Sequence, residues 1–344
     1  MIRDAELKLL VELCAAAIRG EPYLSRDKHD WQRLIQLAKR HRVQGLAWLG
    51  LTGGAESTLP HAMELFEESK SIAHHNLRAV AAAARLKDEF DRRGLTLVFL
   101  KGLTLGALAY PNTMLKMNAD VDVLVDPAKI EAAEECLISL GYRSQAVRRT
   151  ESRRAAAAKE WPWAGSDGVV IDLHVRLADN PALLPAMGTG SPTQDVEVSP
   201  GIVLPTFRNE ELFAYLCVHG ASSAWFRLKW VADLAALLAR CSADEVRRLY
   251  RASRPLSAGR CPDVALLLAE AVFGPLVPAD LIASAKRDPI ARLLARLSER
   301  ELGKAREPTE RPLGTAAIHV CQLFMGRGVH FPMSELGRQL SNLA

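Results

Sequence analysis

The chain has 344 residues, of which 49% are hydrophobic and 24% are charged, and its formal net charge is +4. This length and composition are typical of a globular protein with two or three packed layers, and so mild a charge favours neither a long nucleic acid nor a membrane as partner. No run approaches the ~18 apolar residues of a membrane span, and the six scattered cysteines form no CxxC pair, so the sequence predicts a cytoplasmic protein with reduced thiols and no structural zinc.

Residues 1–93 have a helical pattern. Apolar residues recur at helical spacing over 7–18 and again over 31–38, which predicts two amphipathic helices. Residues 61–93 are rich in Ala, Leu, Glu, Lys and Arg, which predicts a third and much longer helix. We interpret 1–93 as a helical scaffold or lid beside a catalytic sheet.

The pattern changes to strands after Gly94. Residues 96–100 and 121–125 are continuous runs of β-branched and other apolar residues, and 168–177 alternates between apolar and polar residues. A possible further strand begins at Tyr142. Trp161 and Trp163, on either side of Pro162, are interpreted as anchors of a packed loop.

Helices separate and follow these strands. Asp126-Pro127 predicts the start of a helix that runs to about Leu140, because proline is favoured at the first helical position. Residues 178–208 are rich in Pro, Gly, Ser and Thr and predict a long connection, after which helical patterns return from Asn209. The expected fold class is α+β, with a small mixed sheet flanked by helices. The predicted parts are an N-terminal helical segment, a catalytic core and a C-terminal helical domain, over residues 1–93, 94–208 and 209–344.

Asp120 and Asp122 are the first candidate functional residues. Strand side chains alternate between faces, so these two carboxylates point the same way. Paired carboxylates repel each other and are costly to bury unless a cation lies between them. A solvated polar face on an edge strand is the alternative, but the apolar residues of 121–125 favour a buried strand with a metal-binding pair at one end.

Short motifs follow one another in a fixed order along the chain. They are LKG at 100–102, Tyr-Pro at 110–111, DVDVLV at 120–125, Gly-Tyr at 141–142, IDLH at 171–174, LCVHG at 216–220 and RLKWVADL at 227–234. In this order and spacing, over roughly residues 30–240, the chain resembles the uncharacterised bacterial nucleotidyltransferases of the DNA polymerase beta-like superfamily. Members of that family often occur with clusters that modify small peptides or natural products, which suggests a class of acceptor.

The resemblance implies transfer of a nucleoside monophosphate from a nucleoside triphosphate to a small-molecule, peptide or protein acceptor, with release of pyrophosphate. Two Mg²⁺ ions, or Mn²⁺ in their place, lie ~3.5–4 Å apart in such sites, and three carboxylates are needed to hold them. Asp120 and Asp122 match the family's DxD motif, and Asp172 on the later strand would supply the third carboxylate. Ligands that are all oxygen suit Mg²⁺. The alternative for Asp172 is a lone strand carboxylate paired with an arginine.

The resemblance also implies phosphate contacts. Gly102 would allow the backbone to approach a phosphate closely, and Lys101 would supply charge to a phosphate oxygen. Lys116 stands where the family commonly has arginine; lysine keeps the charge but loses the bidentate fork. His174 would orient Asp172 or contact substrate, or else be a satisfied buried histidine, and Arg176 on the same face could contact phosphate.

The C-terminal helices carry further candidates. His219, Arg227, Lys229 and Asp233 fall where family members have similar residues, and Arg227 and Lys229 are candidates for contacts to the base or ribose. The local pattern favours a plainer alternative, a solvated Lys229–Asp233 pair four residues apart beside a core tryptophan, Trp230.

Two other functions remain open from the sequence. The same fold could transfer a phosphoryl or sugar-phosphate group to a peptide. Alternatively, with Lys116 in place of the family arginine, it could be a nucleotide-binding or partner-binding module whose chemistry has lapsed.

Overall fold

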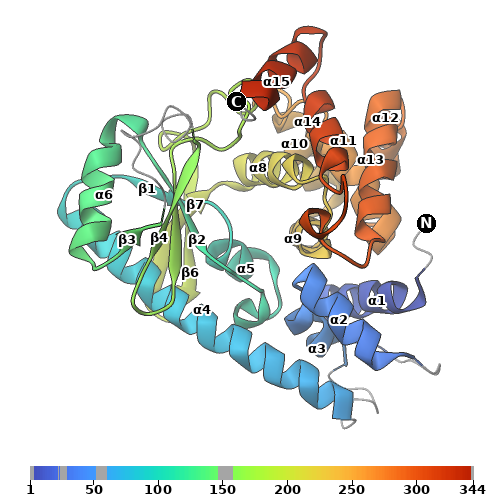
Figure 1. Ribbon diagram of the computed structural model, residues 1–344, viewed down its shortest axis with the longest axis horizontal. Coiled ribbons are helices and arrows are strands. Elements are labelled where there is room, and N and C mark those ends of the chain that lie inside the picture. The colour runs from blue at the N-terminus through green and yellow to red at the C-terminus, as the bar shows by residue number, and fades with distance from the viewer. Residues whose placement is uncertain (1–3, 22, 24–28, 52–59, 146–157, 342–344) are drawn as a thin grey trace.

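The computed structural model describes residues 4–21, 23, 29–51, 60–145 and 158–341. A mixed seven-stranded sheet lies at the centre of the described chain, with helices on both of its faces (Figure 1). The predicted α+β fold class, a mixed sheet flanked by helical segments, is confirmed.

Strand order in the sheet is β3-β4-β5-β2-β1-β7-β6. The central pair is β1 (Leu97–Phe99) and β2 (Val121–Val125), which are antiparallel, and β5 (Val170–His174) lies parallel to β2 on its other side. The outer strands are β3 (Arg143–Ser144), β4 (Glu160–Ala164), β6 (Thr193–Ser199) and β7 (Ile202–Phe207). The three central strands therefore bring the end of β1, the start of β2 and the middle of β5 together.

The two faces of the sheet belong to different hydrophobic cores. Val121, Val123 and Val125 pack with α4 (Pro60–Arg92) and α6 (Ile130–Ser139) on one face. Leu124, one residue out of phase, packs on the other face with α5 (Leu103–Ala109) and the helices beyond it. Because side chains alternate along a strand, Asp122 points to the same face as Leu124, toward that second helical layer.

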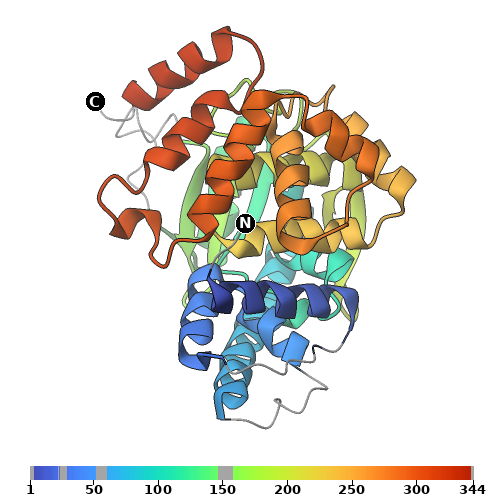
Figure 2. The ribbon, with the colours of Figure 1, turned by 90° about the vertical axis from the view of Figure 1, so that its right-hand side faces the viewer.

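The N-terminal helices are α1 (Ala5–Arg19), α2 (Trp31–His41) and α3 (Gln44–Leu51). Asp4 and Asp30 begin the first two, since each side chain accepts a hydrogen bond from a backbone N–H of the first turn. All three helices contribute to one hydrophobic core with the C-terminal helices (Figure 2). The predicted helical character of 1–93 is confirmed where the structure describes it, and the three-part division of the chain remains a prediction.

The chain beyond the sheet is helical. Its helices are α8 (Asn209–Ser222), α9 (Leu228–Ala239), α10 (Ala243–Ala252), α11 (Cys261–Phe273), α12 (Ala279–Ala285), α13 (Pro289–Leu302), α14 (Ala316–Phe324) and α15 (His330–Ser341). Short 3₁₀ turns occur at η2 (Thr113–Leu115), η3 (Pro127–Lys129) and η4 (Pro308–Glu310). On the face to which Asp122 points, α5 and α8 contact the sheet, and α9 packs against both of them (Figure 1).

Three local predictions need correction. The segment 178–208 contains the β6–β7 hairpin, and β7 pairs with β1 at the centre of the sheet. Trp161 and Trp163 lie on strand β4 and not in a loop; their side chains are buried in the core shared with α4 and α6. The helix expected from Pro127 begins as a 3₁₀ turn and becomes α-helical only at Ile130.

Two expectations from composition can be compared with the structure. All six cysteines are free thiols, five of them buried. Within the described ranges, no helix combines the length and the apolar character needed to span a bilayer.

Candidate functional site

Three carboxylate side chains come together around the start of β2. Asp120 directly precedes β2, Asp122 is its second residue, and Asp172 lies on β5 as the register partner of Asp122. One carboxylate oxygen of each residue lies within 4.8 Å of the others, and this is the group of potential metal ligands found among the described residues. The parallel in-register pairing of β2 and β5 thus brings together residues that are fifty positions apart in sequence.

Lys101 lies directly against this acidic group. It follows β1, and because β1 and β2 are antiparallel, the end of β1 meets the start of β2. The Lys101 ammonium forms an ion pair with Asp122 and lies 4.0 Å from an oxygen of Asp120. The two carboxylates raise the pKa of Lys101 well above its usual range, although burial opposes this. Lys101, which was predicted to contact a phosphate, is thus a counter-ion of the carboxylates in this structure.

His174 approaches Asp122 from the other side. Its Nε2 atom lies 3.1 Å from Asp122 Oδ1, and its Nδ1 atom lies 3.1 Å from Glu160 Oε2 on β4, the latter without hydrogen-bond geometry. Burial raises the pKa of Asp122, but Lys101 and His174 outweigh burial and hold that pKa well below its usual range. Of the alternatives considered for His174, the structure shows a buried histidine, and its carboxylate partner is Asp122.

The pKa of Asp172 is shifted in the opposite direction to that of Asp122. Burial, followed by the negative charges of Asp120 and Asp122, raises the pKa of Asp172 to about 6. A carboxyl group that resists ionisation beside two other carboxylates is stabilised in its charged form by a bound cation. The three side chains supply only carboxylate oxygens, and this donor set fits Mg²⁺ or Mn²⁺.

Gly102 begins the turn between β1 and α5. Its φ angle is +71°, in the left-handed region that glycine adopts readily, and a Cβ atom there would lie 3.4 Å from Asn118 Oδ1. The backbone conformation therefore favours glycine at this position, while the space around it would admit a Cβ atom.

Lys116 belongs to a buried polar cluster next to the carboxylates. Its ammonium donates to Asn118 Oδ1 at 3.0 Å and lies 3.4 Å from Asp233 Oδ1 on α9. Tyr110 also donates to Asp233, at 2.5 Å, and Asn118 donates to Asn76 on α4 at 3.1 Å. The cluster ties the segment that leads into β2 to both helical layers.

The prediction of a solvated pair between Lys229 and Asp233 is wrong, because Asp233 is buried in this cluster. Asp233 is 2% exposed, and its ion pair is with Lys116. Lys229 is largely surrounded by protein but keeps some solvent contact, and burial together with Lys116 lowers its pKa to about 7. The charges of Asp233, Lys101 and Asp120 also act on Lys229.

The remaining candidate residues are His219, Arg176 and Arg227. His219 on α8 is within electrostatic range of Lys101, Lys159 and Asp122, and burial lowers its pKa well below the usual range. Arg176 is half-buried, two residues beyond the end of β5. Arg227, at the N-terminus of α9, donates to Glu307 Oε1 at 3.0 Å.

Sequence reasoning missed four residues near the carboxylates, which are Arg42, Lys159, Glu160 and Tyr215. The charge of Asp120 acts on Arg42, and Lys159 lies 2.9 Å from Glu160 Oε2 beside His174. Tyr215 on α8 is buried, and the charges of Lys101 and Asp122 act on its hydroxyl group. Glu160 and Lys159 could have been found had the alternation around Trp161 and Trp163 been interpreted as a strand.

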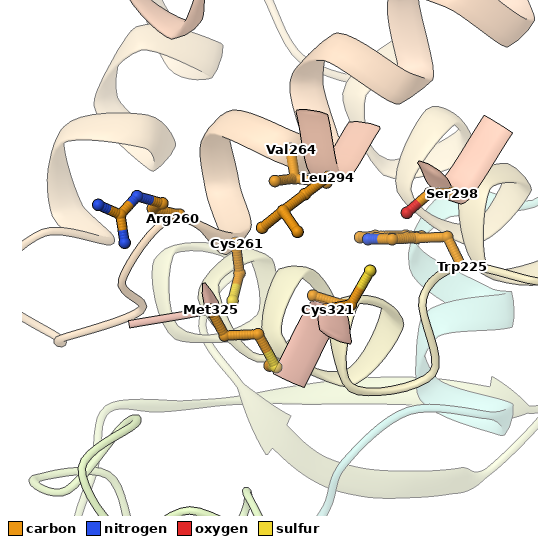
Figure 3. A pocket seen from close by; sticks show the side chains of 9 residues that line it. Trp225, Arg260, Cys261, Val264, Leu294, Ser298, Cys321 and Met325 are labelled. Atoms are coloured by element: carbon orange, nitrogen blue, oxygen red, sulfur yellow. The ribbon is translucent and has the colours of Figure 1, made fainter. Parts of the chain in front are cut away.

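A separate cavity lies among the C-terminal helices, away from the carboxylates (Figure 3). Its volume of about 10 Å³ is room for roughly one water molecule. Trp225 Nε1 and Ser298 Oγ border it and have no hydrogen-bond partner, whereas Cys261 and Cys321 are protonated thiols because burial raises the pKa of each. The cavity is a packing gap too small for a substrate.

The mixed sheet brings together three carboxylates that could hold a metal ion, in an α+β fold consistent with a nucleotidyltransferase core. A family model described as an uncharacterised nucleotidyltransferase matches residues 27–274, and the chain belongs to that family. The matched range contains all three carboxylates and the helices α8 and α9 that face them. No curated protein matches the chain.

Proposed function

We propose that the protein is a metal-dependent nucleotidyltransferase of the polymerase beta-like superfamily. It transfers a nucleoside monophosphate from a nucleoside triphosphate to a small-molecule, peptide or protein acceptor and releases pyrophosphate. Asp120, Asp122 and Asp172 would hold two Mg²⁺ ions, or Mn²⁺ ions. The observation that carries the proposal is the convergence of these carboxylates within 4.8 Å, in a chain of the nucleotidyltransferase family.

The reaction is an in-line displacement at the α-phosphorus. An oxygen of the acceptor forms the new bond, the bond to the β-phosphate oxygen breaks, and its electron pair leaves with pyrophosphate. The metal ions would supply charge neutralisation at the attacked phosphate and at the leaving group. Asp172 would hold one of these ions and orient the acceptor or take up its proton.

The cationic side chains act around this centre. Lys101 would exchange one of its carboxylate partners for a phosphate oxygen when the ions bind, since its ammonium lies beside both Asp120 and Asp122. Lys229 would contact the donor from α9, since the charges of both Lys101 and Asp120 act on it. Lys116 acts indirectly, because its contacts with Asn118 and Asp233 hold the start of β2 in place.

Isotope transfer tests the proposal. The protein is incubated with Mg²⁺, a mixture of peptides and metabolites, and each nucleoside triphosphate labelled either at the α- or at the γ-phosphorus. We expect the α-label alone to reach an acceptor, and we expect Asp122→Asn to reduce transfer by orders of magnitude. The matched control is Asp126→Asn, at the exposed far end of β2, where asparagine can still cap η3. Transfer of the γ-label would indicate phosphoryl transfer instead.

A second candidate, a nucleotide-binding module without turnover, is favoured by one observation. The Lys101 ammonium already neutralises Asp122, as a metal ion would. For such a module, we expect nucleotide binding that survives Asp122→Asn and no transfer of either label.

A further inference from the structure

Four arginines gather where the N-terminal and C-terminal helices meet. Arg40 and Arg42 come from the end of α2, Arg227 from the start of α9, and Arg311 from the turn after η4. Arg227 is paired with Glu307 at 3.0 Å, and Arg311 with Glu301 at 2.5 Å. We call these six residues the arginine cluster.

The arginine cluster carries more positive than negative charge. Its four guanidinium groups are opposed by two carboxylates, which leaves an excess of two positive charges. The exposed Arg306 and Glu310 in the same turn carry opposite charges and leave this excess unchanged. An excess of buried or half-buried cations is unfavourable unless an anion compensates it.

Arg40 shows this imbalance most directly. Its Nη1 atom donates to the backbone oxygen of Phe226 at 2.8 Å, but its Nε atom is buried without a hydrogen-bond partner. The pKa of Arg40 is lowered to about 10, chiefly by burial and in part by Arg311 and Arg227, while Glu307 and Glu301 oppose the shift. An anion at this position would relieve the repulsion.

Arg42 is held in a conformation that suits glycine better. It ends α2 with a φ of +57°, in the left-handed region where a side chain costs conformational energy and where helices most often place glycine. Its side chain is half-buried beside Arg227 and Glu307, and the charge of Asp120 also acts on it. Helix α3, which begins two residues after Arg42, packs against η2, which ends five residues before Asp120. The arginine cluster therefore lies beside the segment that leads to Asp120.

The two halves of the cluster are joined by direct contacts. The buried His41, next to Arg42, accepts a hydrogen bond from the backbone N–H of Leu228 at 3.0 Å. The Arg227 guanidinium lies over the rings of Phe226 and Trp230, at 5.0 and 5.7 Å. These contacts set the arginines in place before any ligand arrives, which reduces the entropy lost on binding.

We propose that the arginine cluster binds the β- and γ-phosphates of the donor, and so receives the pyrophosphate that leaves. This inference rests on the proposed function, in which the α-phosphate lies at the carboxylates and the rest of the phosphate chain extends past Asp120. Guanidinium groups suit such a chain because each can donate two parallel hydrogen bonds to a phosphate. Arg42 is the residue that connects the cluster to the carboxylates.

Calorimetric binding of inorganic tripolyphosphate, without nucleotide or metal, tests the inference. We expect the parent protein to bind tripolyphosphate and Arg42→Gly to bind it at least about tenfold more weakly, since a charged hydrogen-bonding partner is lost. Glycine suits the left-handed backbone, so the variant should keep the parent's melting temperature. The matched control, Arg292→Gln on the exposed face of α13, should bind as the parent does.

Two comparisons separate this inference from the proposed function. Nucleoside monophosphates lack the β- and γ-phosphates, so Arg42→Gly should bind them with Mg²⁺ as the parent does. Asp122→Asn should retain tripolyphosphate binding while losing transfer of the α-label. The inference is overturned if the parent does not bind tripolyphosphate, or if Arg42→Gly binds it as tightly, whatever the outcome of the transfer assay.

Discussion

Replacing Lys101 with methionine should destabilise the metal-free protein, and a divalent ion should restore the loss. At the 4.0 Å between Lys101 Nζ and Asp120 Oδ1, two unit charges attract each other by about 4 kcal/mol at an effective dielectric constant of about 20. Asp122 lies closer and is more buried, and breaking a buried ion pair typically costs roughly 3–5 kcal/mol. For a chain of 344 residues, a loss of about 4 kcal/mol lowers the melting temperature by about 6 °C.

Differential scanning calorimetry with and without Mn²⁺ measures both effects. Mn²⁺ should raise the melting temperature of Lys101→Met more than that of the parent, because the ion takes over the neutralisation that the ammonium provided. Lys87→Met is the matched control, since Lys87 forms an exposed pair with Asp91 on α4 and its loss should cost at most about 1 kcal/mol. The reasoning is refuted if Lys101→Met melts with the parent, or if Mn²⁺ stabilises both proteins equally.

Two further predictions concern the groups around the site. The pKa of Asp172 is about 6, so Mn²⁺ affinity should be full above pH 7 and fall about tenfold per pH unit below pH 6, whereas Asp172→Asn should flatten this dependence in a calorimetric titration. Because the folded-state pKa of Asp172 lies above its unfolded value, the stability that Asp172 contributes to the metal-free protein should be lost as the pH rises from about 4 to 6. The melting temperature of the metal-free parent, taken relative to that of Asp172→Asn, should therefore fall over this range, and a difference that does not change with pH would contradict this. Asp233→Asn leaves the Lys116 ammonium buried without its carboxylate and should lower the free energy of unfolding in urea by roughly 3–5 kcal/mol. Asp280→Asn, which breaks an exposed pair, should cost at most about 1 kcal/mol; equal costs would show that the buried pair is unimportant.

The central strands could be predicted because their apolar runs are strong local signals. Val121, Val123 and Val125 alternate with Asp122, which identified both the strand and the face of the carboxylate. The pairing of Asp122 with Asp172 depends on the parallel register of β2 and β5, which no local pattern contains. Asp172 was instead associated with Asp120 and Asp122 through the family resemblance, which rests on the order of the short motifs.

The β6–β7 hairpin was missed although its sequence carries a signal. Val196 and Val198 alternate with polar residues and are buried, and Gly201 in the turn has a φ of +76°. The overall content of proline, glycine and serine in 178–208 obscured this alternation. Strand β4 was missed for a related reason, because Pro162 at its centre argues against a strand.

The contacts of the charged residues could not be predicted from local spacing. Lys229 and Asp233 are four residues apart on one helix, yet Asp233 pairs with Lys116 from a distant part of the chain because both are enclosed between helical layers. Arg42 likewise carries no local signal, since its significance comes from the approach of α2 to α9.

The most direct test of the central claim is a calorimetric titration of the four common nucleoside triphosphates with Mg²⁺. It compares the parent with the double variant Asp120→Ala/Asp122→Ala, after circular dichroism has shown that both are folded. The account predicts metal-dependent binding of at least one nucleotide by the parent and its loss in the double variant. Equal binding by the two proteins would contradict the claim that these carboxylates hold the metal-bound donor.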